Sequence, residues 1–189
     1  SVQLAARTKS LGLPTPKAVM AVQPGWKGGG KYPVDTLKDV PSSVLMVVID
    51  GSEDQFADTR EGENIFRLTT NVPPERKAYI VLQSDSNSDS KLLADHYAPL
   101  APHPSYKLEN KSGRGALRKG LVKMAMKIRD GEVDTLDRNG FWKIFDELIN
   151  AGFSGGQDIS KVIKSSGGSS MGKWPDGKPV KPRIIKMAQ

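Results

Sequence analysis

The chain has no cysteine among its 189 residues. This absence excludes disulfide bonds, thiolate metal sites and a cysteine nucleophile. Histidine occurs only 2 times, so any chemistry that needs an imidazole must use His96 or His103. No apolar run approaches the roughly 20 residues that a membrane-spanning helix requires, and no basic-then-apolar leader is expected at the start. We therefore expect a protein without a membrane span, located in the cytoplasm.

Charge is the second constraint on the chain. Its 28 Lys and Arg against 21 Asp and Glu give a net charge of +7, which favours acidic partners only weakly. Many of the cations concentrate between Lys111 and Arg129, where Lys119, Lys123 and Lys127 share one predicted helix face. This basic helix leaves a non-catalytic binding module, for nucleic acid or another acidic partner, as an alternative function. Because no aromatic residues interleave with the cations, a solvated helix face is the simpler interpretation.

The stretch from Val44 to Ile49 is an unbroken apolar run rich in valine and isoleucine. Such a run predicts a strand that is buried on both faces of a parallel sheet. It is followed by Asp50, by Gly51 and then by the pair Glu53-Asp54. In open sheets flanked by helices, functional sites lie just beyond the carboxyl ends of the strands.

Further strands are predicted at Lys17–Gln23 and Lys77–Ser84, each bounded by turn-forming or polar residues. A helix is predicted over residues 1–11, with Ser1 as its N-cap, and another from Asp58, with Glu61 at capping-box spacing. Strands that alternate with helices predict an α/β fold, in which a parallel sheet has flanking helices and right-handed crossovers.

The remainder of the chain is predicted to be helix and loop. Ser84–Ser90 is polar and predicts a loop. An apolar stripe of Phe141, Ile144, Phe145 and Leu148 predicts a further helix. From Gly167 onward the composition favours an extended surface tail. We therefore expect one domain over residues 1–189, with its main portion at 1–166 and a C-terminal tail at 167–189.

An acid followed later by a histidine is the second half of a Ser-His-Asp hydrolase triad. Asp54 and His96 occur in this order, each after a predicted strand. Glu53 is a possible substitute for the acid, and His103 lies between two prolines, a rigid context. The alternative is that Asp54 caps the following turn and that His96 is an ordinary surface residue.

A nucleophile is harder to place. One Gly-x-Ser-x-Gly pattern, Gly168, Ser170 and Gly172, follows the acid and the histidine, and no strand leads into it. Without a strand–turn–helix context we interpret it as a chance match. Ser1 could act through its own α-amino group, but a serine at or within a helix start is the simpler interpretation.

Several segments together resemble the C-terminal half of bacterial α/β-hydrolase-fold esterases. They are LAARTKSLGLPTPKAVMAVQPG at Leu4–Gly25, VPSSVLMVVIDGSEDQFADTREGENIFRLTTNVP at Val40–Pro73, LLADHYAPLAP at Leu92–Pro102, DTLDRNGFWKIFDEL at Asp134–Leu148 and MGKWPDGKPVKP at Met171–Pro182. The resemblance implies a partial α/β-hydrolase fold, with Asp54 as the triad acid and His96 as the triad base. It also implies that the nucleophile, its elbow and the oxyanion hole lie upstream of Ser1.

The resemblance implies a carboxylic-ester hydrolase, or a portion of one, that acts on a small ester without a cofactor or a metal. The single chain would then need a second copy of itself, or a separate chain that carries the missing half, to cover the exposed edge of the first strand. Trp26 and Phe56 are candidates for lining an acyl pocket, although ordinary packing is the simpler role for both.

Overall fold

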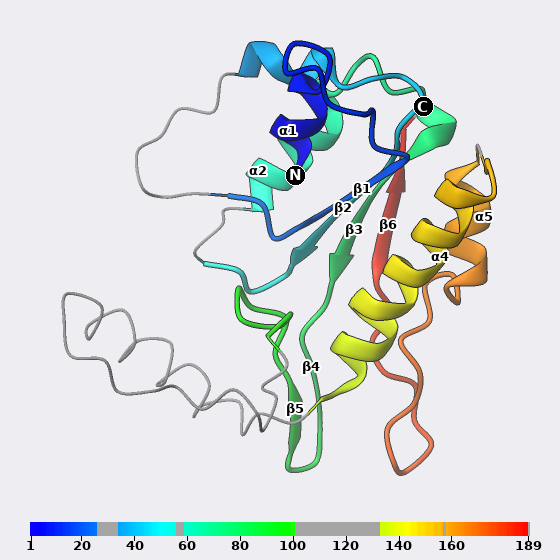
Figure 1. The fold of residues 1–189 in the computed structure, drawn as a ribbon. Coiled ribbons are helices and arrows are strands. Elements are labelled where there is room, and N and C mark those ends of the chain that lie inside the picture. Colours follow the sequence, from blue (N-terminus) through cyan, green and yellow to red (C-terminus); the bar gives the residue numbers. More distant parts are fainter. Residues whose placement is uncertain (26–33, 56–58, 101–132, 157, 189) are drawn as a thin grey trace, which may run out of the picture.

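A four-stranded sheet forms the centre of the structure, a computed structural model that describes residues 1–25, 34–55, 59–100, 133–156 and 158–188. The strands are β1 (Ala18–Val22), β2 (Leu45–Gly51), β3 (Lys77–Leu82) and β6 (Ile184–Met187), in the order β1-β2-β3-β6. The first three are parallel, as predicted, and β6 runs antiparallel to β3 (Figure 1). The sheet is therefore mostly parallel, with one antiparallel edge strand.

The central strand β2 is buried at every position, which confirms the prediction of burial on both faces. Leu45, Val47 and Ile49 belong to one hydrophobic cluster, and the alternate residues Met46 and Val48 belong to another. Because successive side chains of a strand point to opposite faces, each cluster lies on its own side of the sheet. Because both faces of β2 are covered, apolar residues are favoured at successive positions of the strand, and this explains the unbroken apolar run in the sequence.

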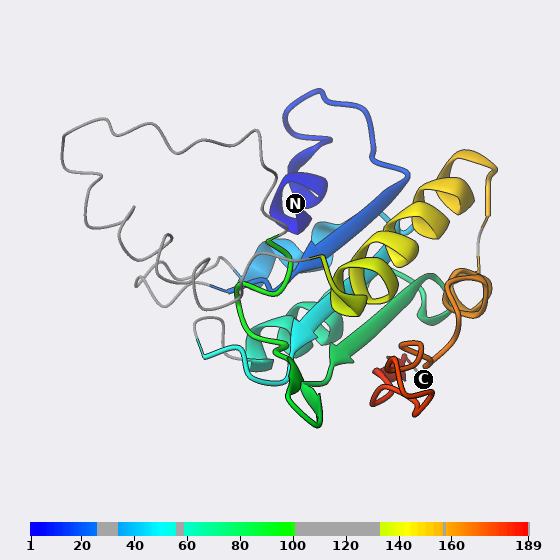
Figure 2. The same cartoon turned by 90° about the horizontal axis from the view of Figure 1, so that it is seen from below.

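Helices cover both faces of the sheet. On one side lie α1 (Val2–Arg7), α2 (Thr59–Leu68) and the short 3-10 helix η1 (Val34–Asp39); on the other lie α4 (Lys143–Phe153) and α5 (Ile159–Ser165) (Figures 1 and 2). A further 3-10 turn, η2 (Pro74–Arg76), precedes β3, and the π-helix η3 (Leu136–Trp142) leads directly into α4. The three layers confirm an α/β fold with flanking helices.

The first helix is shorter than predicted. It ends at Arg7 rather than Leu11, and the turns that follow reach Gly12, which has a φ of 64° that glycine adopts easily. Ser1 occupies the N-cap position, but its side chain makes no capping hydrogen bond. The Thr8 hydroxyl instead donates to the Ala5 carbonyl, which satisfies one of the acceptors at the C-terminal end.

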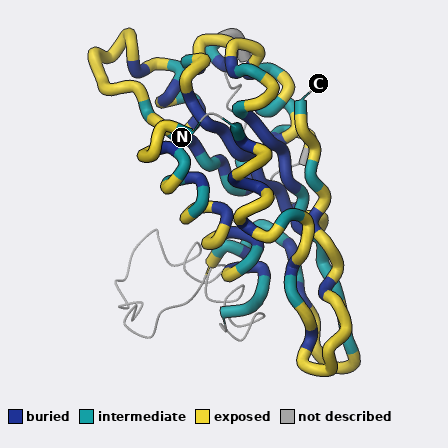
Figure 3. Tube along the Cα trace, turned by 90° about the vertical axis from the view of Figure 1, so that its right-hand side faces the viewer, coloured by how far each residue is buried: buried dark blue, intermediate teal, exposed yellow. Residues whose placement is uncertain are grey.

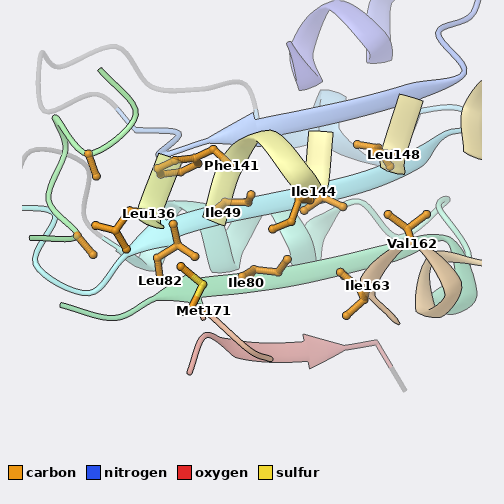
Figure 4. Close-up of a cluster of buried hydrophobic side chains, with 14 of the residues drawn as sticks. Ile49, Ile80, Leu82, Leu136, Phe141, Ile144, Leu148, Val162, Ile163 and Met171 are labelled. Carbon is orange, nitrogen blue, oxygen red and sulfur yellow. The ribbon is translucent and has the colours of Figure 1, made fainter. Parts of the chain in front are cut away.

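The larger core lies between the sheet and α4–α5. Ile49, Ile80 and Leu82 point from the strands toward Ile144 and Leu148 of α4 (Figure 4). The prediction that Phe145 belongs to the same buried stripe is wrong, because this side chain is 50% exposed. With Ile144 and Leu148 directed inward, Phe145 falls outside the arc of the helix that the sheet can cover.

The segment from Gly167 onward is part of the folded core, so the expectation of a surface tail needs correction. Its Met171, Trp174 and Val180 are buried in the larger core, and β6 completes the sheet. Arg183 is only 2% exposed and donates to the backbone oxygens of Gly168, Asn139 and Ser166, while burial lowers its pKa to about 10. The Gly- and Lys-rich composition concealed these widely spaced buried residues.

The predicted loop at Ser84–Ser90 is a hairpin of β4 (Asp85–Asn87) and β5 (Ser90–Leu92), which projects beyond the sheet with its tip exposed (Figure 3). Asp85 ties this hairpin to the C-terminal segment. Its carboxylate accepts hydrogen bonds from the Lys181 backbone N–H at 2.8 Å and from the Trp174 indole N–H at 3.0 Å. These bonds lower the pKa of Asp85, with the Lys181 bond as the main cause.

We expect Asp85→Asn to lower the free energy of unfolding by about 1 kcal/mol near neutral pH, because the two donors lose a charged acceptor. Since the folded-state pKa of Asp85 lies below its ordinary value of 3.8, the stabilisation is fully present above that value and is lost as the pH falls through the folded-state pKa. Urea titrations of both proteins across this pH range measure the difference. Asp89→Asn, in the exposed tip of the same hairpin, is the control, and an equal loss in the two variants would contradict the account.

Candidate functional site

Asp54 and His96 lie together beyond the carboxyl ends of the parallel strands, although 42 positions separate them in the sequence. The Nδ1 atom of His96 is 2.9 Å from Oδ2 of Asp54. The Asp54 side chain is 1% exposed, whereas that of His96 is 34% exposed. The geometry favours the acid–base interpretation of these residues over a turn cap and an unrelated surface histidine.

The buried carboxylate determines which ring nitrogen of His96 carries the proton. An ionised carboxylate can only accept hydrogen bonds, so the Nδ1 atom that faces Asp54 is the donor. In the neutral imidazole, Nε2 then holds the lone pair. A histidine oriented in this way can accept a proton at Nε2, and the carboxylate stabilises the positive charge that results.

The turn after β2 explains why Asp54 is the residue that reaches the histidine. Its backbone N–H donates to the Gly51 carbonyl at 3.1 Å, and this closes a turn that brings the side chain inward. Glu53 is exposed, so the structure does not support it as a substitute acid.

Asp50 has a different role, because it accepts a hydrogen bond from the Tyr79 hydroxyl at 2.7 Å within the fold. Burial raises the pKa of Tyr79, and the bond to Asp50 adds to this effect. A Cβ atom on Gly62 would overlap the Asp50 carboxylate, so α2 can pack over this pair only with glycine at that position.

The loop that carries His96 is attached to the ends of all three parallel strands. Beyond β1, the Gln23 side-chain amide donates to the Asp95 carbonyl. Beyond β2, the Glu53 N–H donates to the Ala94 carbonyl at 3.0 Å. Beyond β3, the Ser84 hydroxyl accepts from the Ala94 N–H at 2.9 Å. The two residues that precede His96 are thus held from three strand ends, which positions the backbone that carries the imidazole.

Gly51 allows this loop to approach the sheet closely. A Cβ atom at this position would overlap the backbone carbonyl of Ala94 and would also contact the Gln23 side chain. Neither a backbone carbonyl nor the end of a strand can move aside at low cost. The close approach of the histidine loop therefore requires glycine at the last position of the central strand.

His96 forms part of the wall of a pocket of about 770 Å³. The first residues of α1, the end of β1 and the inner face of α2 also contribute to it. The lining is largely apolar, with a few polar groups, which is the usual character of a site for a small organic molecule. Its apolar residues include Val2, Val22, Leu37, Ile65, Leu68 and Leu100.

Ser1 lines the same pocket as His96, because the start of α1 lies at the same end of the sheet as the carboxyl end of β1. A polypeptide segment that entered α1 from this side would pass close to the imidazole.

Other sequence-based candidates lie elsewhere. Ser170 follows α5 and precedes a turn and the isolated Lys173–Pro179 bridge, so it has no strand before it and no helix after it. This context agrees with the interpretation of the Gly-x-Ser-x-Gly pattern as a chance match. His103, Trp26, Phe56 and the basic helix at 111–129 lie outside the described residues.

Within the described part of the chain, no group of three or more His, Asp or Glu residues has the arrangement of a metal site. Nor does any helix in that part have the length and apolar character needed to cross a membrane.

Sequence reasoning missed the residues that hold the histidine loop in place. Gln23 directly follows β1, Gly51 ends β2 and Ser84 lies two residues beyond β3, and this shared position at the strand ends was the available signal. In addition, Gln23 has a φ of 43°, which a non-glycine residue rarely adopts. Such backbone conformations cost about 1–3 kcal/mol and concentrate at functional sites.

Comparison with models of protein families, with curated proteins and with solved structures found no match to this chain.

We expect Gly51→Ala to move the Ala94 carbonyl and to weaken the Asp54–His96 contact. The cost should be roughly 1–3 kcal/mol of unfolding free energy, a range typical of overpacking a buried position. Chemical denaturation measures this loss, and the rate at which diethylpyrocarbonate modifies His96 should rise. Gly155→Ala is the control without overlap, because a Cβ there meets nothing within 4 Å. Since Gly155 has a positive φ and Gly51 does not, any loss in this control comes from backbone strain rather than from a clash. An unchanged modification rate at His96 in a folded Gly51→Ala protein would contradict this role.

Proposed function

We propose that Asp54 and His96 are the acid and base of a Ser-His-Asp carboxylic-ester hydrolase. The observation that carries the proposal is the 2.9 Å contact between a buried carboxylate and a half-exposed imidazole at the wall of an apolar pocket. The proposal is supported by the order of Asp54 and His96 in the sequence, by their contact and by the burial of the Asp54 carboxylate. The resemblance to bacterial esterases also supports it.

The chemistry follows from the two side chains. A serine hydroxyl beside His96 would give its proton to Nε2 as its oxygen attacks the ester carbonyl. The resulting imidazolium then donates that proton to the departing alcohol, which leaves an acyl-serine. Water, activated by the same nitrogen, releases the acid and restores the serine. Asp54 keeps Nδ1 protonated and steadies the charge throughout.

The hydroxyl would come from a segment that enters the pocket beside Ser1. Two features support such a segment. The outer edge of β1 pairs with no other described strand, and its residues Ala18–Val22 include no charge. By contrast, β6 at the opposite edge carries Lys186 and follows Pro182, residues that discourage further strand pairing.

The helix next to β1 also exposes apolar side chains. Trp142, at the end of η3, is 45% exposed, and Phe145 and Phe153 of α4 are 50% and 84% exposed. Gly152 of the same helix packs against Lys17 and Ala18 at the start of β1. Exposed aromatic residues beside an unpaired apolar strand are typical of a surface that another polypeptide covers. The covering partner is a second copy or a polypeptide that supplies the serine, and hydrolysis requires the latter.

Hydrolysis of p-nitrophenyl acetate tests the acid–base pair. The p-nitrophenolate group leaves readily, so the imidazole of His96 can catalyse this hydrolysis even without the serine. We therefore expect His96→Ala to abolish the part of the rate that depends on the protein. Asp54→Asn should lower it by about 10²-fold, since the imidazole loses its fixed tautomer. Glu53→Gln removes the neighbouring exposed carboxylate and serves as the control for charge. Equal rates in the wild-type and His96→Ala proteins would sink the proposal.

Light scattering coupled to size-exclusion chromatography measures the mass of the protein in solution and so tests whether the edge of β1 and the exposed side chains of α4 form an interface. In the absence of another chain, we expect the protein to associate with itself through β1 and α4. Phe153→Asp should weaken association by at least about tenfold, equivalent to about 1.4 kcal/mol. Ile184→Asp, on the opposite edge strand, should not. A well-folded, inert monomer would argue against this part of the proposal.

A further inference from the structure

Gln23 has an unusual combination of properties for a residue that directly follows an outer strand. It is only 4% exposed, and its φ of 43° lies in the left-handed region. Glutamine has no special tolerance for this region, unlike glycine or asparagine. The backbone conformation is therefore maintained by the surroundings of the residue rather than by its own preference.

The contacts of Gln23 show what this conformation achieves. Its backbone N–H donates to the Ile49 carbonyl at 2.7 Å, which keeps it attached to β2. Its side-chain Nε2 reaches across to the Asp95 carbonyl, which also accepts the Ala98 N–H at 3.0 Å. One residue thus joins the end of β1 to the backbone turn that contains His96.

The other side-chain atom of Gln23 has a different environment. Oε1 is buried and has no hydrogen-bond partner among the described atoms. Buried polar atoms are normally paired, and exceptions often mark functional positions. Since Nε2 must face the Asp95 carbonyl, the amide cannot turn over to satisfy Oε1 without losing that bond. The amide is therefore oriented so that Nε2 bonds to the histidine loop, while Oε1 is left without a hydrogen bond among the described atoms.

We propose that Gln23 is a positioning residue for His96. By holding the Asp95 carbonyl, it keeps the imidazole in the orientation in which Nδ1 faces Asp54. Gln23 belongs to the pocket wall together with His96 but makes its contribution through the backbone of the loop. This inference rests on the proposed function, because positioning matters for catalysis only if His96 is the base.

The test is the tautomeric state of His96, measured by ¹⁵N NMR of the imidazole ring at a pH where the ring is neutral. The chain has 2 histidines, so His103→Gln leaves a single ring to observe. We expect the wild-type protein to show the Nδ1–H tautomer alone. Gln23→Met, which removes the amide but keeps the length of the side chain, should convert this pattern into an exchange-averaged mixture of both tautomers.

Two further variants separate the amide from other effects. Gln23→Asn favours the left-handed backbone but is one methylene too short to reach Asp95, so we expect the same mixture of tautomers. It also serves if Gln23→Met fails to fold. Gln83→Met is the matched control, because the Gln83 amide likewise donates to a backbone carbonyl, that of Pro182, outside the pocket lining. This control should retain the Nδ1–H tautomer.

The outcomes distinguish the two proposals. A single Nδ1–H tautomer that persists in both Gln23 variants would overturn the role of Gln23 and leave the Asp54–His96 pair intact. A mixture of tautomers already present in the wild-type protein would overturn both proposals. Loss of the single tautomer in Gln83→Met as well would show that general destabilisation, rather than the Asp95 contact, controls His96.

Discussion

The attachment of one short loop to three strand ends is the constraint on which the candidate site depends. Asp54 is placed by a tight turn directly after β2, but His96 arrives much later in the chain and has no regular element of its own. Its position follows from hydrogen bonds that Gln23, Glu53 and Ser84 make to Ala94 and Asp95. Parallel strands make this possible, because their carboxyl ends meet at one rim.

The core explains why that rim is stable enough to hold a site. Alternate residues of β2 belong to the two hydrophobic clusters on opposite faces of the sheet. A shift of this strand by one residue would turn every side chain to the opposite face, so the register that leads to Asp54 is fixed. On one side Asp50 and Tyr79 form a buried polar pair beneath α2. On the other, Arg183 joins three backbone carbonyls and fixes the C-terminal segment against η3. Rigid surroundings of this kind limit the freedom of the acid and the base.

Much of the fold could be predicted from local patterns. The apolar runs in β1, β2 and β3 were long and bounded by turn residues, so both their existence and their parallel arrangement were predictable. The strand β6 was not, because its residues are partly exposed and β3, its one neighbour among the described strands, lies about a hundred residues earlier. Likewise, the β4–β5 hairpin is polar throughout its turn, and it is attached to the rest of the fold by hydrogen bonds between its Asp85 and the distant residues Trp174 and Lys181.

The candidate site was predictable only in part for a similar reason. Asp54 and His96 are chemically distinctive and follow strands, so their order in the chain indicated a shared role. Gln23 and Gly51 have no distinctive chemistry. Their importance lies in a left-handed backbone and in the absence of a Cβ atom, each of which becomes visible only when the loop that approaches them is known.

The pairing of Asp54 with His96 is the central claim, and a double-mutant cycle tests it most directly. Unfolding free energies of the wild-type protein, Asp54→Asn, His96→Ala and the double variant yield the coupling between the two side chains. Direct contact predicts a coupling of roughly 0.5–3 kcal/mol. Strictly additive effects, with no coupling beyond the error of the measurement, would show that the two residues do not interact and would contradict the account.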